Sequence, residues 1–293
     1  LSKDRVRNIL TEGGTILGSS NKDDPFAMPI KSNGALIKVD MSAKALKTYK
    51  KLKLDALVVI GGDGTMAIAH KCAVIGMNIV GVPKTIDNDL AATDYTFGFD
   101  TAVATATEAI DKLRTTAASH SRIMVVELMG RYAGWLTLHA GLAGGADVIL
   151  LPEMPYDLRI IVNTIKRKMR KGRRSFIVAV SEGAHPIGEG MVVDRVVKES
   201  HDPIRLGGIG KKLALDLEDA LGVEARVCVL GHVQRGGSPN AHDRVLATRF
   251  GLAALELVTR QKFGRMVCLK DGVISSTTLH AVTRALKLVT KDD

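Results

Sequence analysis

The sequence predicts an α/β protein with mostly parallel sheets flanked by helices, arranged as two facing domains. Short apolar segments alternate with segments whose apolar residues recur every three or four positions, which is the order of a βαβ chain. The apolar residues are mostly Val, Ile, Leu and Ala, as in strands buried on both faces, while aromatic residues make up only 4%. Polar or glycine-rich turns follow five of the apolar segments, at 61–65, 83–89, 129–134, 181–183 and 231–238.

The first ninety residues predict an irregular start and then the first strands of a sheet. Pro83 is expected to end the second buried strand, because proline cannot donate to a ladder. The elements expected in order are a short strand within 13–20, a loop at 21–35, a short helix around Leu46, Tyr49 and Leu52, a strand at 56–60, a helix at 65–75 and a strand at 77–82.

From residue 99 onward the expected helices and strands alternate regularly. A boundary near Gly98 would leave two sheets that face each other across a cleft. The elements expected after it are a helix at 99–118, a strand at 123–129, a helix ending near 143, a strand at 148–151, a helix around 161–169, a strand at 176–180, an excursion or loop at 184–203, a helix at 209–221, a strand at 225–230, a helix around 246–257, a last strand at 266–269 and a last helix at 278–289.

The composition favours a cytoplasmic protein. The 293 residues are 46% hydrophobic and 25% charged, enough for one large domain or two ordinary ones. No apolar run approaches the ~20 residues of a membrane span, and the first residues do not resemble a signal peptide. Cys72, Cys228 and Cys268 are odd in number and far apart, which favours structural thiols in a reducing cytosol. We therefore expect no membrane partner.

The formal charge of +10 is concentrated in part at residues 166–174, where seven of nine residues are basic. Such a run can bind anions, but cations also suit the solvated end of a helix, and we favour this second interpretation. No aromatic residues are interleaved with the run, so the stacking platform of single-strand binders is absent. We therefore expect no nucleic-acid partner.

Two loops that follow neighbouring predicted strands carry groups suited to phosphoryl transfer. The first, at 61–65, has glycines that let backbone N–H groups approach phosphate, beside the start of a helix. Its Asp63 could hold Mg²⁺, although a bare glycine-rich turn is the alternative. The second loop offers Thr85, Asp87 and Asp89, of which a free carboxylate could orient an acceptor hydroxyl. The alternative for this loop is a turn whose polar residues bond only their own backbone.

Four arginines near the ends of later strands indicate a phosphorylated acceptor. Arg122, Arg131, Arg226 and Arg235 could each grip phosphate in a bidentate way. A surface salt bridge is the commoner role for any one arginine. The combination with Glu182 and His232 at similar loops favours the phosphate interpretation.

Taken together, these segments resemble the 6-phosphofructokinase family over nearly the whole chain. The first motif also occurs in NAD kinases and diacylglycerol kinases, whereas the full set is specific. The resemblance implies a phosphofructokinase-like fold and a glycolytic transfer of phosphoryl from ATP, with Mg²⁺, to the 1-hydroxyl of fructose 6-phosphate. The matching motifs are Gly-Gly-Asp-Gly-Thr at 61–65, Pro-Lys-Thr-Ile-Asp-Asn-Asp at 83–89, Met-Gly-Arg-Tyr at 129–132, Ser-Glu at 181–182 and Gly-His-Val-Gln-Arg-Gly-Gly-Ser-Pro at 231–239.

The resemblance also implies roles for individual residues. Asp87 would be the base that takes the sugar hydroxyl proton, flanked by Thr85 and Asp89, and Arg131 would steady charge on the transferring group. Asp63 would be the metal residue. The residues implied to bind fructose 6-phosphate are Thr85, Ile86, Asp87, Arg122, Met129, Gly130, Arg131, Glu182, Arg226, His232 and Arg235. Those implied to bind the donor are Asn21, Lys22, Gly62, Asp63, Gly64, Thr65 and Lys84.

The family pattern further implies a homotetramer, since Arg122 and Arg226 match arginines that reach a neighbour's 6-phosphate. The implied domains are 1–98 plus 235–285 for the donor and 99–234 plus 286–293 for the sugar phosphate and the interface. Arg114, Asp147 and Arg173 match positions that bind ADP or phosphoenolpyruvate effectors, which implies allosteric control.

Two departures from the family pattern affect the donor site. Family members usually open with a strand and a Gly-Gly-Asp-x-Pro-Gly loop, and nothing like it precedes Leu1, so we expect that this chain lacks its natural N-terminus. Many members carry Arg after the Gly-Ser-Ser turn, where this chain has Asn21 and then Lys22. Lys22 could substitute as a point charge.

Two residues bear on the identity of the phosphoryl donor, and they favour different donors. Gly64 leaves room for a nucleotide α-phosphate, where pyrophosphate-using relatives usually have Asp, but Lys84 is typical of those relatives. We favour ATP, because blocked space is harder to offset than an added cation. The alternatives are a pyrophosphate-dependent phosphofructokinase, a kinase of another phosphate-bearing acceptor such as NAD, and a catalytically dead regulatory or anion-binding subunit.

Overall fold

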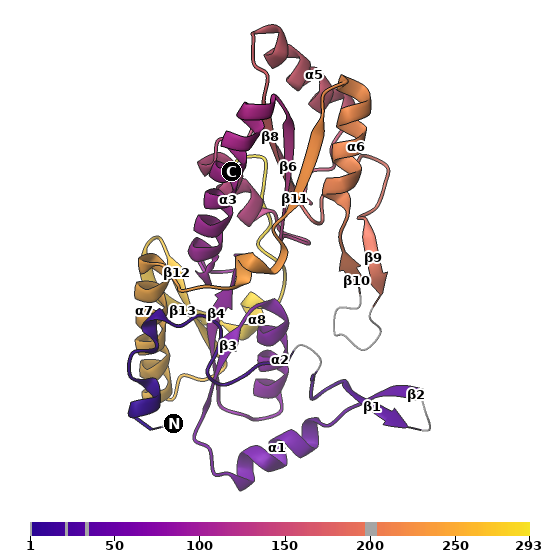
Figure 1. The fold of residues 1–293 in the computed structure, drawn as a ribbon. Helices are drawn as coiled ribbons and strands as arrows, with labels where there is room; N and C mark the ends of the chain where they lie inside the picture. The colour runs from indigo at the N-terminus through magenta and orange to yellow at the C-terminus, as the bar shows by residue number, and fades with distance from the viewer. Residues whose placement is uncertain (1, 21–22, 33–34, 197–203) are drawn as a thin grey trace.

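Figure 1 shows the computed structural model of the chain, which describes residues 2–20, 23–32, 35–196 and 204–293. The molecule is elongated, with one sheet in the lower half of the view and a second sheet in the upper half. Each sheet has helices on both faces, so the predicted α/β class is confirmed. Among the described residues, no helix is both long and apolar enough to cross a membrane.

The lower sheet has the order β13-β12-β4-β3, and a short strand, β5, pairs with the end of β4. β3, β4 and β12 are parallel, while β13 is antiparallel to β12. One face is covered by α1, α2 and α8, and the other by α7. The bounds are β3 Leu57–Gly61, β4 Ile79–Thr85, β5 Phe97–Gly98, β12 Arg265–Lys270, β13 Val273–Thr278, α1 Ser42–Lys51, α2 Asp63–Val74, α7 Ala241–Thr259 and α8 Leu279–Val282.

The upper sheet is all parallel, with the order β11-β6-β8-β7. The central strands β6 and β8 are buried along their whole length, as their apolar sequences predict. α5 and α6 cover one face, and α3 and α4 cover the other. The bounds are β6 Ile123–Leu128, β7 Val148–Leu150, β8 Phe176–Ser181, β11 Ala225–Val229, α3 Phe99–His120, α4 Trp135–Ala143, α5 Leu158–Arg170 and α6 Ile209–Leu221.

The two halves meet around the amino end of α3. Phe99 and Leu136 are fully buried there, and Ile86 from the lower sheet and Met129 from the upper sheet pack against them. The buried carboxylate of Asp243, in the first turn of α7, accepts hydrogen bonds from the backbone N–H (2.8 Å) and the hydroxyl (2.5 Å) of Thr101. The start of α3 is therefore anchored to the helix that covers the lower sheet.

In the part of the chain that the structure describes, two antiparallel strand pairs and three short 3₁₀ helices lie outside the two main sheets. The N-terminal segment runs beside α7 in Figure 1, where the Ser238 hydroxyl donates to the Thr11 carbonyl (2.6 Å). The bounds are β1 Met28–Ser32 with β2 Ala35–Val39, β9 Val193–Val196 with β10 Ile204–Leu206, η1 Asp4–Val6, η2 Ile9–Thr11 and η3 Gly231–Arg235.

The prediction that Pro83 ends its strand is wrong, because β4 continues to Thr85. Pro83 is paired with Gly61 of β3 at the last position of that ladder. On the other side of β4, the ladder with β12 stops at Gly81 and the ladder with β5 starts at Lys84. At Pro83 that side has no paired residue, so the missing N–H costs no ladder bond.

Four other element predictions need correction. Residues 13–20 form no strand, since Gly14 and Gly18 have left-handed φ values of 73° and 74° and interrupt an extended backbone. The expected loop at 21–35 contains β1, which pairs with β2. The strand at 266–269 is not the last, because the polar β13 follows it as a sheet edge. The expected helix at 278–289 ends at Val282, after which the chain extends and Leu286 pairs with Leu90.

Candidate active site

The loop after β4 is held in one conformation by its own polar side chains. The Thr85 hydroxyl donates to Asp87 Oδ2 (3.2 Å) and accepts from the Asp87 backbone N–H (3.1 Å). Thr96 is buried, donates its hydroxyl to the Thr85 carbonyl (2.8 Å) and donates its N–H to Asn88 Oδ1 (3.1 Å). Asn88 has a left-handed φ of 51°, which asparagine tolerates. The backbone-turn interpretation is thus partly correct, but Asp87 and Asp89 are also influenced by charged groups from other loops.

Both carboxylates of this loop titrate abnormally because of burial. Burial raises the pKa of Asp87, opposed by the charge of Arg235, the hydrogen bond from Thr85 and the charge of Arg131, while Asp63 adds to the rise. Burial and the charges of Asp87 and Asp63 raise the pKa of Asp89 to about 7. Asp89 Oδ1 is buried and has no hydrogen-bond partner within the described residues. The three carboxylates and two arginines therefore share one electrostatic environment.

The first loop is the open amino end of α2. The helix begins at Asp63, two residues earlier than predicted, with Gly62 at the N-cap and no side-chain cap. Its first intrahelical bond runs from the Met66 N–H to the Gly62 carbonyl (2.9 Å). The N–H groups of Asp63, Gly64 and Thr65 consequently precede the helical ladder and can meet an anion.

Glycines let this helix start lie against the β4 loop. A Cβ on Gly61 would overlap the Thr65 side chain, and one on Gly62 would come 3.3 Å from Thr85 Cβ. Asp63 and Lys84 are exposed on the same side of the lower sheet, at the ends of β3 and β4. Asn21 and Lys22, also predicted for the donor, lie outside the described residues.

Three loops from the upper sheet interlock at its carboxyl edge. The Gly183 N–H donates to the Gly130 carbonyl (3.1 Å), and the Glu182 N–H donates to the Leu128 carbonyl (2.8 Å). Buried Gln234 in η3 accepts from the Met129 N–H (3.3 Å). A Cβ on Gly183 would overlap the Arg131 carbonyl, so only glycine fits there. Met129, Gly130, Arg131 and Glu182 are thereby brought together as predicted.

Glu182 and the cations of these loops face the lower carboxylates. Burial raises the pKa of Glu182, which a hydrogen bond from Gly130 and the charge of Arg131 oppose and the charge of Asp87 reinforces. Arg131 donates to the Ile204 carbonyl (2.5 Å), and its guanidinium lies 5.7 Å from the Tyr132 ring centre. His232 and Arg235 are exposed on η3.

Arg122 and Arg226 do not join this group within the subunit. They precede or begin β6 and β11, at the amino edge of the upper sheet, so a strand length of roughly 17–20 Å separates them from its carboxyl edge. Both form ion pairs with Glu224. Arg122 and Arg226 thus lie at strand ends, as expected, but at the edge of the upper sheet opposite to Arg131 and Arg235.

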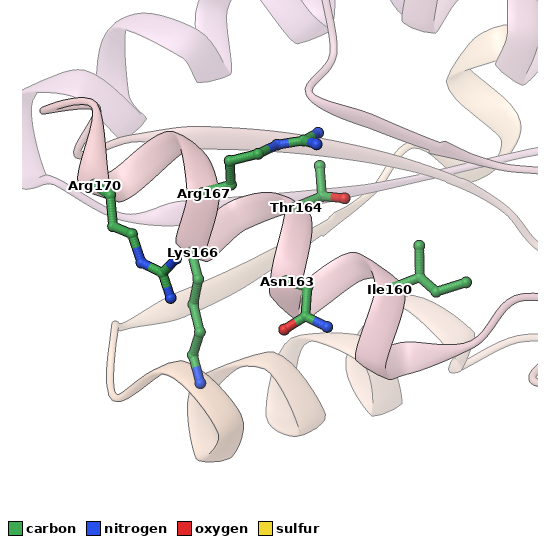
Figure 2. Close-up of a pocket in the computed structure, with 6 residues that line it drawn as sticks. All are labelled: Ile160, Asn163, Thr164, Lys166, Arg167 and Arg170. Atoms are coloured by element: carbon green, nitrogen blue, oxygen red, sulfur yellow. The ribbon is translucent and has the colours of Figure 1, made fainter.

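The predicted effector residues are already paired with protein groups. The buried carboxylate of Asp147 binds Lys168 Nζ (2.7 Å) and Arg173 Nη1 (2.8 Å), and Arg114 donates to the carbonyls of Gly144 and Gly145. Part of the basic run lines a shallow pocket of about 410 Å³ on α5. Figure 2 shows its six lining residues on this one helix, which fits a solvated helix face; they are Ile160, Asn163, Thr164, Lys166, Arg167 and Arg170.

Sequence reasoning missed several residues that support the site. Thr96 and Gln234 orient the two loops, and Glu153 and Lys287 connect them through the end of the chain. Gln234 lies inside a recognised motif, so its buried position had a signal in the sequence. Lys287 had none, because it was expected on a helix.

The parallel sheets, with polar loops at their carboxyl edges, place the chain in a broad class of proteins. These are the α/β proteins that bind ligands at the carboxyl ends of parallel strands. The family model described as Phosphofructokinase matches residues 1–258. The chain therefore belongs to the phosphofructokinase family.

Individual relatives agree with this family. The chain is 52% identical to ATP-dependent 6-phosphofructokinase 2 of Clostridium perfringens, over 96% of this chain and 78% of that protein. It is 50% identical to pyrophosphate–fructose 6-phosphate 1-phosphotransferase of Amycolatopsis methanolica, over 99% of this chain and 81% of that one. Pichia pastoris phosphofructokinase in the T-state superposes with a TM-score of 0.81 at 30% identity, covering 97% of this chain and 31% of that much longer chain.

Proposed function

We propose that this protein is an ATP-dependent 6-phosphofructokinase, which transfers phosphoryl from Mg-ATP to the 1-hydroxyl of fructose 6-phosphate. The observation that carries the proposal is the environment of Asp87. This carboxylate is influenced at once by Asp63 beside the α2 amino end and by Arg131 and Arg235 on the upper sheet. A donor at α2 and an acceptor at the upper sheet would meet at Asp87.

In this proposal Asp87 accepts the proton of the sugar 1-hydroxyl. Its raised pKa makes it a better base than an ordinary aspartate. Thr85 fixes the carboxylate through the hydrogen bond to Oδ2, and Ile86 fixes the loop by packing at the junction. Asp89 lies next to this base, with its own pKa raised by the charge of Asp87, and Arg131 stabilises charge on the moving phosphoryl group.

Fructose 6-phosphate would bind on the upper sheet. Met129, Gly130 and Glu182 supply backbone and carboxyl groups for sugar hydroxyls, and the exposed side chains of His232 and Arg235 can donate hydrogen bonds to the 6-phosphate. Arg122 and Arg226 would serve the 6-phosphate of a neighbouring subunit, which is why we propose a homotetramer.

The donor would bind at the lower sheet. The open N–H groups of Gly64 and Thr65 suit phosphate oxygens, and Lys84 and the N-cap at Gly62 border the same space. Asn21 and Lys22 are proposed to complete this site.

Magnesium fits the residues present. Mg²⁺ is usually held by one or two carboxylates together with substrate phosphates and water, not by a protein cage. Within the described part of the chain, no cluster of three or more His, Cys, Asp or Glu residues forms such a cage, while Asp63 is exposed at the phosphate-binding helix end. When bound, the ion would neutralise charge on the donor phosphates.

The remaining assignments follow the same family pattern. We propose the domains 1–98 plus 235–285 for the donor and 99–234 plus 286–293 for the sugar phosphate. We also propose a cytoplasmic, glycolytic enzyme. Control by ADP or phosphoenolpyruvate stays a prediction. Arg173 and Asp147, two of the residues expected to bind the effector, form an ion pair with one another in the subunit.

Pyrophosphate is the second candidate donor, favoured by Lys84 and by the similarity to the Amycolatopsis methanolica enzyme, which is named as a pyrophosphate-dependent phosphotransferase. ATP remains the choice because Gly64 leaves space at the first turn of α2 and the Clostridium perfringens relative is named as ATP-dependent.

The donor is tested with Mg²⁺, fructose 6-phosphate and either ATP or pyrophosphate as the sole donor. We expect faster turnover with ATP. The variant Gly64→Asp should lose ATP use by at least ~10²-fold, because a carboxylate would occupy and repel the α-phosphate position. Faster turnover of the parent protein with pyrophosphate, or full ATP use by the variant, contradicts the proposal.

A further inference from the structure

Residues 286–289 form an extended segment that runs between the two halves of the molecule. Leu286 makes an antiparallel bridge with Leu90, and the Lys287 N–H donates to the Asp89 carbonyl (2.7 Å). We refer to residues 286–289 as the connecting segment. It touches the carboxylate loop of the lower sheet directly after Asp89.

The Lys287 side chain fastens the rest of that loop. Its ammonium donates to the carbonyls of Thr93 (3.1 Å) and Asp94 (2.7 Å). Thr93 is itself buried, and its hydroxyl accepts from the Leu269 N–H of β12 (3.0 Å). One lysine thus binds both ends of the turn that follows the proposed base.

The opposite side of the connecting segment is bonded to the upper half. The Trp135 indole N–H donates to the Lys287 carbonyl (2.8 Å), and the ammonium lies 5.3 Å from the Trp135 ring centre. Glu153 Oε1 accepts from the Val289 N–H (2.9 Å) and from the Gly134 N–H (2.9 Å). Gly134 ends the loop that carries Met129 to Arg131, so the segment joins the two loops of the site.

From these contacts we infer that Lys287 is a positioning residue for phosphoryl transfer, which holds the Asp87–Asp89 loop against α4 and places a cation beside Asp89. This inference rests on the proposed function. Lys287 hydrogen-bonds the base loop and Trp135 of α4, whereas the residues proposed to bind the sugar lie on other loops, so its loss should act on the chemical step more than on sugar binding.

Charged groups surround the pair from several elements. Lys287 faces Asp89 and Asp94 of the lower half, His139 of α4 and Asp293 near the end of the described chain. Burial lowers the pKa of Lys287 to about 8, and these three aspartates oppose the change. Asp89 faces Asp87 and Asp63 besides Lys287, which is the cation that favours its ionised form. Removing the ammonium takes away this favourable charge and leaves the repulsion from Asp87 and Asp63.

The test compares Lys287→Met, Lys287→Arg and Lys291→Met in the full-length protein. For Lys287→Met we expect kcat to fall by at least ~10-fold with KM for fructose 6-phosphate changed less than ~3-fold. The acid limb of its kcat profile should move to higher pH by about one pH unit, because the pKa of Asp89 rises. Lys287→Arg keeps the cation and should restore the position of that limb.

Trp135 emission and a control variant distinguish a positioning role of Lys287 from a general loss of structure. Trp135 is the one tryptophan of the chain, so its emission reports the connecting segment and should shift in Lys287→Met. Exposed Lys291 lies four residues away, and Lys291→Met should match the parent protein in every assay. A cooperatively folded Lys287→Met with an unchanged pH profile overturns the inference. If the parent protein itself lacks turnover, the proposed function fails. In that case the Trp135 emission of Lys287→Met still tests the structural part of the inference, and an unchanged emission shows that Lys287 does not hold the connecting segment in place.

Discussion

At the scale of single residues, Asp89 couples the site to protein stability. Asp89 is only 8% exposed, and its pKa of about 7 in the folded chain compares with 3.8 for a free aspartate. The folded state therefore binds an extra proton between about pH 4 and pH 7. The stability that Asp89 contributes is fully present below pH 4 and is lost as the pH rises through 7.

The pH dependence can be measured with Asp89→Asn, which cannot titrate. Relative to the parent protein, the variant should gain free energy of unfolding between pH 4 and pH 8, by up to about 4 kcal/mol at about 1.4 kcal/mol per pKa unit. Urea unfolding at several pH values gives this difference. Asp111→Asn on the exposed face of α3 is the control and should show no trend. A flat difference for Asp89→Asn would contradict burial as the cause.

At the scale of elements, the conformation of the loop after β8 requires glycine at position 183. A methyl group on Gly183 has no room beside the Arg131 carbonyl, so Gly183→Ala must push the 129–131 loop aside. We expect a loss of about 1–3 kcal/mol in stability and a raised KM for fructose 6-phosphate. Thermal unfolding and steady-state kinetics measure both.

Gly190 supplies the matched control for this substitution. It lies seven residues further along the chain, and a Cβ there meets nothing within 4 Å. Gly190→Ala should leave KM unchanged and alter stability by less than about 0.5 kcal/mol. Equal effects at the two positions would show that crowding against Arg131 does not cause the changes in stability and KM of Gly183→Ala.

Elements were predictable from sequence where local pattern and tertiary packing agree. The buried strands β6 and β8 and the long helices have apolar patterns that no other structure satisfies. Prediction failed where partners far along the chain decide the outcome. Pro83 is tolerated only because β12 and β5 leave its side of β4 unpaired, and polar β13 is a strand because β12 offers an edge.

The site shows the same division. The Thr85–Asp87 pair is local, and the loops at 61–65 and 129–134 follow predicted strands, so their convergence could be expected from a parallel sheet. Lys287 and Glu153 act through backbone contacts with residues distant in sequence. Arg122 and Arg226 lie on the opposite sheet edge because they start their strands, a distinction that strand boundaries alone decide.

At the scale of the whole molecule, the proposed tetramer predicts complementation between defective subunits. Asp87→Asn alone should cut turnover by at least ~10²-fold, the scale of a general base. Arg226→Ala should raise KM for fructose 6-phosphate. When the two variants are co-expressed, some sites combine an intact Asp87 with a neighbour's intact Arg226. The activity of the mixture should therefore exceed the sum of the activities of the two variants expressed alone.

A second mixture shows whether that recovery comes from shared sites. Arg131 and Asp87 interact within one subunit, so co-expressing Asp87→Asn with Arg131→Ala should restore nothing. Recovery in this mixture, or none in the first, would contradict the proposed contribution of Arg226 to a neighbour.

The anchoring of α3 at Asp243 has a mechanical consequence. The helix has 22 residues and is therefore about 33 Å long, and Thr101 fixes its amino end to α7. A tilt of about 5° at that pivot would move the far end, beyond Arg114, by roughly 3 Å. Because buried residues of α3 pack on the upper sheet, such a tilt would carry that sheet with it, and the outer rim of the upper half would move farthest.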